Sequence, residues 1–250
     1  TSEHVGALWA RGRALSELDR VDEACATLGD AADLAGAAGL DALAAEVRVS
    51  RSVCLLTAGD PDGARRELDA AAPDLEGGPL GRMIVQRGLL EAYAGRLAPS
   101  LADFDAALPL LVAAGDDVGR CRLLVNRGIV HSLLGHLDHA EADLIACRDL
   151  DGELGQEMDV AAATHNLVFV RGRAGVLPSP LRWLDEARRA YERLGATRLV
   201  ANLEGDLCGV LLAGGLHAEA AEVAERLARA AAADGNRLTE AEARLLHARA

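Results

Sequence analysis

The segment 126–144, NRGIVHSLLGHLDHAEADL, is one copy of a pattern that recurs along the chain. Between recurring glycines the sequence is rich in Ala, Leu, Arg and Glu, which form helices readily, and glycine readily adopts the left-handed conformation that ends a helix. Each interval therefore predicts one helix and its turn. The glycines stand twenty residues apart, at Gly95, Gly115, Gly135, Gly155, Gly175, Gly195, Gly215 and Gly235.

Alternate glycines have different neighbours, so the repeating unit spans two intervals. Seven residues before every second glycine the chain carries mostly small residues, and nine residues after it mostly bulky ones. Small residues allow two helices to approach closely, and bulky ones fill the space between them. A helical hairpin of about 40 residues is therefore predicted, repeated six times. The small positions are Gly12, Ser52, Gly88, Gly128, Val168 and Cys208, and the bulky ones are Leu28, Leu68, Phe104, Leu144, Leu184 and Ala224.

The predicted architecture is a single repeat domain over residues 1–250, because the period is continuous. It is predicted to be all-α, because no segment alternates with period two as a strand would. The second unit is four residues short, near Gly77 and Gly78, and Pro73 is expected to stop its second helix. Pro109 is expected to bend a helix or end it early. The predicted units are 3–38, 41–77, 79–115, 117–155, 158–195 and 197–235, with the start of a seventh at 237–250.

Composition narrows the classes of function. The chain of 250 residues is 50% hydrophobic but only 2% aromatic, so its core must be built from Ala, Leu and Val. A net charge of −13 argues against nucleic acid as a partner, which requires a basic surface. All 26 basic residues are Arg, a composition expected of a GC-rich, actinobacterial source.

Location is inferred from the cysteines and from the apolar runs. Five dispersed cysteines fit a reducing cytoplasm. No apolar run is judged long enough to span a membrane, and the start of the chain has no signal-peptide pattern, so no membrane partner is expected. Both ends are expected to be cut from a longer protein.

Particular residues resemble a known family. Asn126-Arg127-Gly128, followed by Gly135, Ala140 and Leu144, resembles the tetratricopeptide repeat (TPR), and the segment 87–108 repeats the pattern. This resemblance implies a right-handed α-solenoid of TPR-like hairpins with longer helices, since the usual TPR unit has about 34 residues. The chain is similar to repeat arrays of actinobacterial multidomain proteins such as CHAT-domain (caspase-like peptidase) proteins, and to those of signalling ATPases and transcriptional regulators.

Signals of catalysis are sparse. The chain has no Lys for a phosphate-binding loop and no Gly-x-Ser-x-Gly motif. Zinc requires three or four converging ligands, but His131 precedes a turn whereas His136 and His139 follow it, so we interpret all three as solvated polar residues near a helix start. No catalytic, cofactor-binding or metal-binding residue is predicted. A Cys–His nucleophilic pair stays open, because such partners are adjacent only in space.

The TPR resemblance implies a ligand surface on the inner face of each first helix. Arg and amide side chains there can hold a carboxylate or an extended peptide backbone, which favours an acidic or C-terminal peptide. The alternative is that these groups merely solvate an unused surface. The predicted peptide-binding residues are Arg82, Gln86, Arg122, Asn126, His165, Asn166, Phe169 and Arg173.

A second set of arginines recurs in register directly before the small positions. We predict a structural role for these side chains: each lies along a neighbouring helix and pairs with a carboxylate of the repeat. They are Arg11, Arg51, Arg87 and Arg127.

The function predicted from the sequence is a non-catalytic scaffold that binds a peptide or a partner domain on its concave face. It would be the sensor or adaptor region of a larger cytoplasmic signalling or effector protein, and the partner domain could belong to the same full-length chain. One alternative is a hydrolase that uses Cys and His or a metal. Another is a module for structural packing or self-association.

Overall fold

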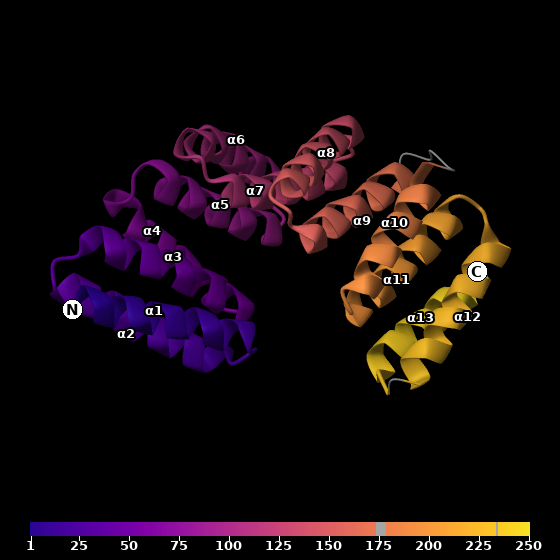
Figure 1. Ribbon diagram of the computed structural model, residues 1–250, viewed down its shortest axis with the longest axis horizontal. Coiled ribbons are helices and arrows are strands. Elements are labelled where there is room, and N and C mark those ends of the chain that lie inside the picture. Colours follow the sequence, from indigo (N-terminus) through magenta and orange to yellow (C-terminus); the bar gives the residue numbers. More distant parts are fainter. Residues whose placement is uncertain (174–178, 234) are drawn as a thin grey trace. The chain divides into compact units, whose positions relative to one another are not determined.

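The computed structural model describes the backbone of residues 1–173, 179–233 and 235–250, and the side chains of these ranges except 173–182. All regular structure in these ranges is helical, which confirms the all-α prediction (Figure 1). The helices are α1 Ser2–Glu17, α2 Val21–Ala37, α3 Asp41–Thr57, α4 Pro61–Ala71, the 3-10 helix η1 Ala72–Asp74, α5 Gly77–Tyr93, α6 Leu97–Ala114, α7 Asp117–Leu133, α8 Leu137–Glu153, α9 Glu157–Arg173, α10 Ser179–Arg193, α11 Thr197–Ala213, α12 His217–Ala233 and α13 Arg237–Arg249.

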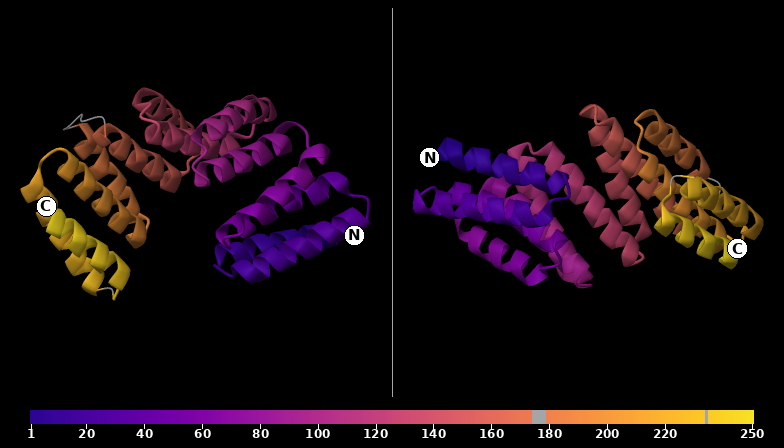
Figure 2. Two further views of the ribbon diagram at one scale, coloured as in Figure 1. Left: turned by 180° about the vertical axis from the view of Figure 1, so that it is seen from behind. Right: turned by 90° about the horizontal axis from the view of Figure 1, so that it is seen from below.

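The helices form two compact units, residues 1–123 and 124–250, and the division falls inside α7. The first unit contains the hairpins α1/α2, α3/α4 and α5/α6, and the second contains α8 and the hairpins α9/α10 and α11/α12, followed by α13. Successive helices of each unit lie side by side in all three ribbon views (Figure 2). The single-domain boundary of 1–250 stays a prediction.

The turns have the geometry that the glycine spacing predicts. Gly135 has a φ of 79°, and the amide of the next residue, His136, donates to the carbonyl of His131 at 2.9 Å. This 6→1 hydrogen bond is the Schellman motif, which satisfies carbonyl groups at a helix end. At the first turn Asp19 takes the same conformation, with a φ of 59°.

The small and bulky positions face each other, as predicted, in the hairpins whose small position is a glycine. A Cβ atom placed on Gly88 would lie 2.9 Å from the ring of Phe104. One placed on Gly128 would lie 3.2 Å from both the Ala140 carbonyl oxygen and Leu144. The two helices of these hairpins therefore pack closely because the small position lacks a side chain.

Prolines shape two hairpins. In the short second unit, α4 has 11 residues and passes at Ala71 into η1, which contains Pro73, so this helix stops where predicted. Pro109 lies inside α6, and that helix nevertheless continues to Ala114. Of the two expected effects of Pro109, an early end of the helix is therefore excluded, and a bend stays a prediction.

Helix α6 is also long and apolar enough to cross a membrane by length and composition alone. In this respect the expectation that no run has such a length is wrong. The helix packs against α5, and its Phe104 and Ala107 are buried in that hairpin. Its Asp103 accepts two hydrogen bonds from Arg87 of α5.

The first helices of neighbouring hairpins form a closely packed layer within each unit. Helix α3 contacts both α1 and α5, and α11 contacts both α9 and α13. In the described part of the chain, successive second helices show no comparable contact. Gly172 lets α9 approach α11, because a Cβ atom at this position would overlap the side chain of Val210. This layer carries the predicted site.

Candidate partner-binding surface

The arginines that precede the small positions are structural in three hairpins. Arg127 of α7 donates two hydrogen bonds to Asp143 of α8, at 2.8 and 2.7 Å. Arg87 binds Asp103 in the same two-pronged way, at 3.0 and 2.6 Å. Arg51 donates to Glu67 at 2.7 Å. These pairs join the two helices of one hairpin, which confirms their predicted role.

In the first unit, side chains of the first-helix layer bind one another. The Trp9 indole of α1 donates to the Ser50 hydroxyl of α3 at 2.8 Å. The Arg82 guanidinium of α5 donates to Glu46 of α3 at 3.2 Å and to Asp116 at 2.8 Å. The positive charge of the predicted ligand surface is therefore neutralised at Arg82, because two carboxylates bind its one guanidinium.

Asp116 is held firmly in this network. Its other carboxylate oxygen accepts a hydrogen bond from the Gly119 amide at 2.9 Å, in the first turn of α7. Burial alone would raise the pKa of Asp116, but the bonds from Arg82 and Gly119 lower it below the ordinary value. Gln86, one turn beyond Arg82 on α5, is half-buried. Arg122 is exposed on α7.

The second unit presents a different mixture of side chains. His165 of α9 lies 2.9 Å from the Asp206 carboxylate of α11, measured from Nε2 to Oδ2, and its ring meets Tyr191 edge-on. Asn126 on α7 and Asn166 on α9 are half-buried at equivalent repeat positions. Phe169 remains 37% exposed.

The apolar part of this surface is repeated as well. Ile129 of α7 is 41% exposed and occupies the position equivalent to Phe169, forty residues earlier. The side chain of Arg173, at the end of α9, lies outside the described residues. Among the described residues of the second unit, the predicted site thus combines amides with exposed apolar groups.

Three side chains of this layer were missed from the sequence. Glu46 and Ser50 lie six and two residues before the small position of the second hairpin, and Asp206 lies two residues before that of the sixth. These are the positions that identified Arg82 and Asn126. Extending the same count to the second and sixth hairpins would have found them.

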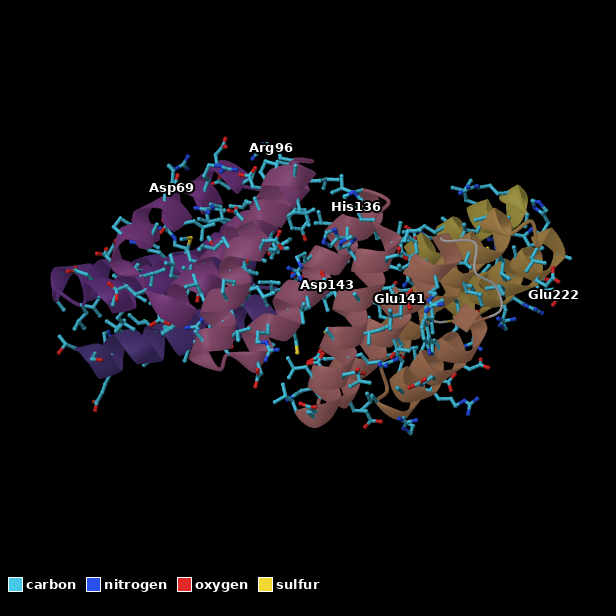
Figure 3. All side chains as sticks on the ribbon, turned by 90° about the horizontal axis from the view of Figure 1, so that it is seen from above. Asp69, Arg96, His136, Glu141, Asp143 and Glu222 are labelled. Carbon is cyan, nitrogen blue, oxygen red and sulfur yellow. The ribbon has the colours of Figure 1, made fainter. Side chains whose placement is uncertain are left out.

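The histidines around the α7–α8 turn are brought together in space. The Nδ1 atoms of His131 and His136 are 3.4 Å apart, and the ring of His139 stacks on that of His131 at 5.1 Å. Burial is the main cause that lowers the pKa of half-buried His131. Figure 3 shows His136 at one end of this hairpin, with Asp143 farther along it. The three rings therefore lie together, with His136 and His139 exposed, and their interpretation as solvated polar residues near a helix start stays a prediction.

The cysteines have packing roles where their contacts are described. The buried Cys147 thiol donates to Asp151 at 3.2 Å, and the Cys208 thiol donates to the Ala220 carbonyl at 3.4 Å. Burial raises the pKa of the Cys208 thiol, and also that of Cys25. Because the thiolate is the reactive form, these two thiols are poor nucleophiles at neutral pH.

Comparison with known proteins identifies the fold. No protein-family model and no curated protein matches the sequence. Among solved structures, the chain resembles a signal transduction ATPase with numerous domains from Pyrococcus horikoshii that has a tetratricopeptide repeat sensor. The TM-score is 0.77 at 11% identity, over 94% of this chain but only 35% of that protein.

Two further structures are similar over most of their length. The apo form of RapI matches with a TM-score of 0.70 at 12% identity, over 98% of this chain and 96% of RapI. A Rap protein complexed with competence and sporulation factor matches with a TM-score of 0.70 at 12% identity, over 97% of this chain and 73% of the Rap protein. At such identities the likeness establishes the fold alone. The chain is a TPR-like array of helical hairpins.

Proposed function

We propose that this chain is a non-catalytic scaffold that binds a peptide or a partner domain across its first-helix layer. The observation that carries the proposal is the repeated surface of the second unit, where side chains of one kind recur at equivalent positions of successive first helices. Asn126 and Asn166 are one such pair, and Ile129 and Phe169 are the other. A surface that repeats with the hairpin suits a ligand that also repeats, as a peptide backbone does.

The chemistry of these groups fits an extended peptide. Each Asn amide can both donate to a peptide carbonyl and accept from a peptide N–H group. Ile129 and Phe169 offer exposed apolar area that a ligand side chain can cover, which contributes about 25 cal/mol per Å² removed from water. Arg122 adds an exposed positive charge for an acidic group or a C-terminal carboxylate. The proposed peptide-binding residues of the second unit are Asn126, His165, Asn166, Phe169 and Arg173, and those of the first unit are Arg82, Gln86 and Arg122.

Arg82 can bind a ligand only if the ligand displaces a carboxylate that Arg82 already binds. Its guanidinium is shared between Glu46 and Asp116, so a ligand carboxylate must compete with two that are already present. We therefore place the main anchoring contacts in the second unit. His165, which bonds Asp206, would serve as a fixed wall of the surface.

The wider role proposed is that of a sensor or adaptor region in a larger cytoplasmic protein. Two similar structures support it by their descriptions: one is an ATPase with a tetratricopeptide repeat sensor, and the other is a Rap protein in complex with a factor. The ATPase is much longer than this chain. An effector such as a CHAT domain would then lie outside the 250 residues.

The test begins with peptides selected from a random library displayed on phage, using the whole chain as bait. For a selected peptide, Arg122→Ala should weaken binding about tenfold or more, and Asn166→Ala, which removes bonds to a neutral backbone, by up to about tenfold, measured by fluorescence anisotropy. A hydrogen bond to a charged group contributes roughly 1.5–3 kcal/mol, and 1.4 kcal/mol corresponds to a tenfold change in Kd.

Arg229→Ala is the control for net charge, because Arg229 is exposed on the second helix α12. Arg188, also on a second helix, is unsuitable because it binds Glu204 at 2.5 Å. Equal losses from Arg122→Ala and Arg229→Ala would mean that overall charge governs binding. Full affinity in both Asn166→Ala and Arg122→Ala would place the binding site elsewhere.

A further inference from the structure

The cluster of three histidines at the α7–α8 turn is the feature that the proposed function leaves unexplained. His131 lies on the last turn of α7, His136 directly precedes α8, and His139 lies on the first turn of α8. The three ring centroids are 5.6, 5.1 and 6.1 Å apart. Because the chain has only seven histidines, three in one small volume invite a chemical explanation.

The closest pair of ring nitrogens has the spacing of two zinc ligands. Imidazole nitrogens bind Zn²⁺ at about 2.0–2.1 Å in a tetrahedron, so two of them on one ion lie roughly 3.3–3.4 Å apart. The Nδ1 atoms of His131 and His136 are 3.4 Å apart. One ion between these two nitrogens would therefore need little movement of either ring.

The third ring lies beside the other two, and its nitrogens must move before all three rings can share one ion. In a tetrahedral site the centroids of two bound imidazoles lie roughly 5 Å apart, since each centroid is about 1 Å beyond its nitrogen. The ring of His139 is 5.1 Å from that of His131 and 6.1 Å from that of His136. His139 is exposed, so a rotation of its side chain can bring a nitrogen to the ion without disturbing the core.

The preceding hairpin shows that the repeat brings the side chains at the positions of His131 and His136 close together. Glu91 and Arg96 occupy the positions equivalent to His131 and His136, and their side chains form an ion pair. The hydrogen bond from Arg96 lowers the pKa of Glu91 to about 2. The backbone turn is also the same, because the amide of Arg96 donates to the carbonyl of Glu91. The fold thus holds these two positions together whichever side chains they carry.

We propose that His131, His136 and His139 form a Zn²⁺ site with three imidazole ligands. A site with three protein ligands leaves the fourth position for water or for a carboxylate of a partner. The ion would tie the end of α7 to the first turn of α8. This site is independent of the peptide surface, so either proposal can fail without the other.

The test uses the whole metal-free chain and Zn²⁺ alone, titrated in competition with a chromophoric chelator. One equivalent of Zn²⁺ should bind saturably, and Co²⁺ in its place should give the intense visible absorption of a four-coordinate ion. His136→Ala and His139→Ala should each lower the affinity at least about tenfold, because even outer-shell partners of a metal ligand account for 10–100-fold.

His217→Ala is the matched control, since His217 is exposed on the first turn of α12 and should leave the affinity unchanged. The double variant His131→Glu, His136→Arg copies the ion pair of the preceding hairpin; it should keep its helical circular dichroism and lose the same affinity. Absence of saturable binding, or equal losses from His217→Ala and His139→Ala, would overturn the proposal.

Discussion

Hairpins α5/α6 and α7/α8 hold their two helices together differently from hairpins α9/α10 and α11/α12. In the earlier pair a glycine at the small position adjoins an ion pair between the two helices, which is partly exposed at Arg87 and Asp103 and largely buried at Arg127 and Asp143. In the later pair the small position is Val168 or Cys208, and apolar residues replace the ion pair. The replacing pairs, sixteen residues apart as before, are Leu167 with Trp183 and Leu207 with Val223.

The difference teaches that one hairpin geometry accepts two kinds of cross-helix contact. Leu167 and Leu207 are buried, so the later hairpins gain apolar burial at positions where the earlier ones keep charge. Burying an ion pair costs the hydration free energy of both charges, which their mutual attraction offsets only when the geometry is good. Replacing both partners with apolar residues is therefore often neutral or stabilising. Removing only one partner is costly in either case.

The largest expected effect comes from breaking one ion pair. Asp143→Ala should lower the free energy of unfolding by about 3 kcal/mol, the lower end of the range for a buried pair, because it removes both hydrogen bonds to Arg127. The Arg127 side chain, 16% exposed, has limited access to water as a substitute. Urea denaturation followed by circular dichroism measures the change.

Asp149→Ala is the control for this variant. Asp149 pairs with the neighbouring Arg148 on the surface, a contact that contributes less than about 1 kcal/mol. Comparable losses from Asp143→Ala and Asp149→Ala would remove the distinction between buried and exposed pairs on which the comparison depends.

An intermediate effect is expected from filling the small position. Gly128→Leu should destabilise the chain by about 1–3 kcal/mol, because the new side chain meets the Ala140 carbonyl and Leu144. Gly152→Leu makes the same substitution on α8, where an added Cβ meets open space, and should not destabilise. Thermal melts of the two variants measure the difference. A Gly128→Leu variant that melts like the parent would show that this hairpin, like α9/α10, has room for a larger residue.

The smallest effect is expected from converting one type of hairpin into the other. Arg127→Leu with Asp143→Val copies the Leu207 and Val223 pair of α11/α12, and should change the free energy of unfolding by less than about 1 kcal/mol. Urea midpoints of this double variant and of Asp143→Ala provide the comparison. A double variant as unstable as the single one would mean that the ion pair specifies α7/α8 in a way that apolar packing cannot replace.

The fold could be predicted from the sequence because its signals depend on spacing along the chain. Glycines at fixed steps set the turns, and residues sixteen apart, such as Gly128 and Leu144, meet within one hairpin whatever the neighbouring hairpins do. The early stop of α4 at η1 follows from Pro73 in the same local way. Pro109 did not end its helix, which continues to Ala114.

The candidate site was less predictable because its partners come from different hairpins. Arg82 lies 36 residues from Glu46 and 34 from Asp116. The sequence does not show which carboxylates its guanidinium will bind. The three histidines were noted in the sequence, but their side chains were not expected to converge. His131 lies on the last turn of α7 and His136 directly precedes α8, and the tight turn between them brings the two side chains together.

The uniform turns also bear on how such a chain changes in evolution. Gly95, Gly135 and Gly215 share one backbone conformation, with φ values of 74°, 79° and 73°. A recombination event that removes or duplicates one repeat therefore rejoins a helix end to a turn of the same geometry. If the reading frame is kept, the small and bulky residues keep their spacing from that turn. Gene length can thus change by whole hairpins, while contacts within each surviving hairpin are inherited intact.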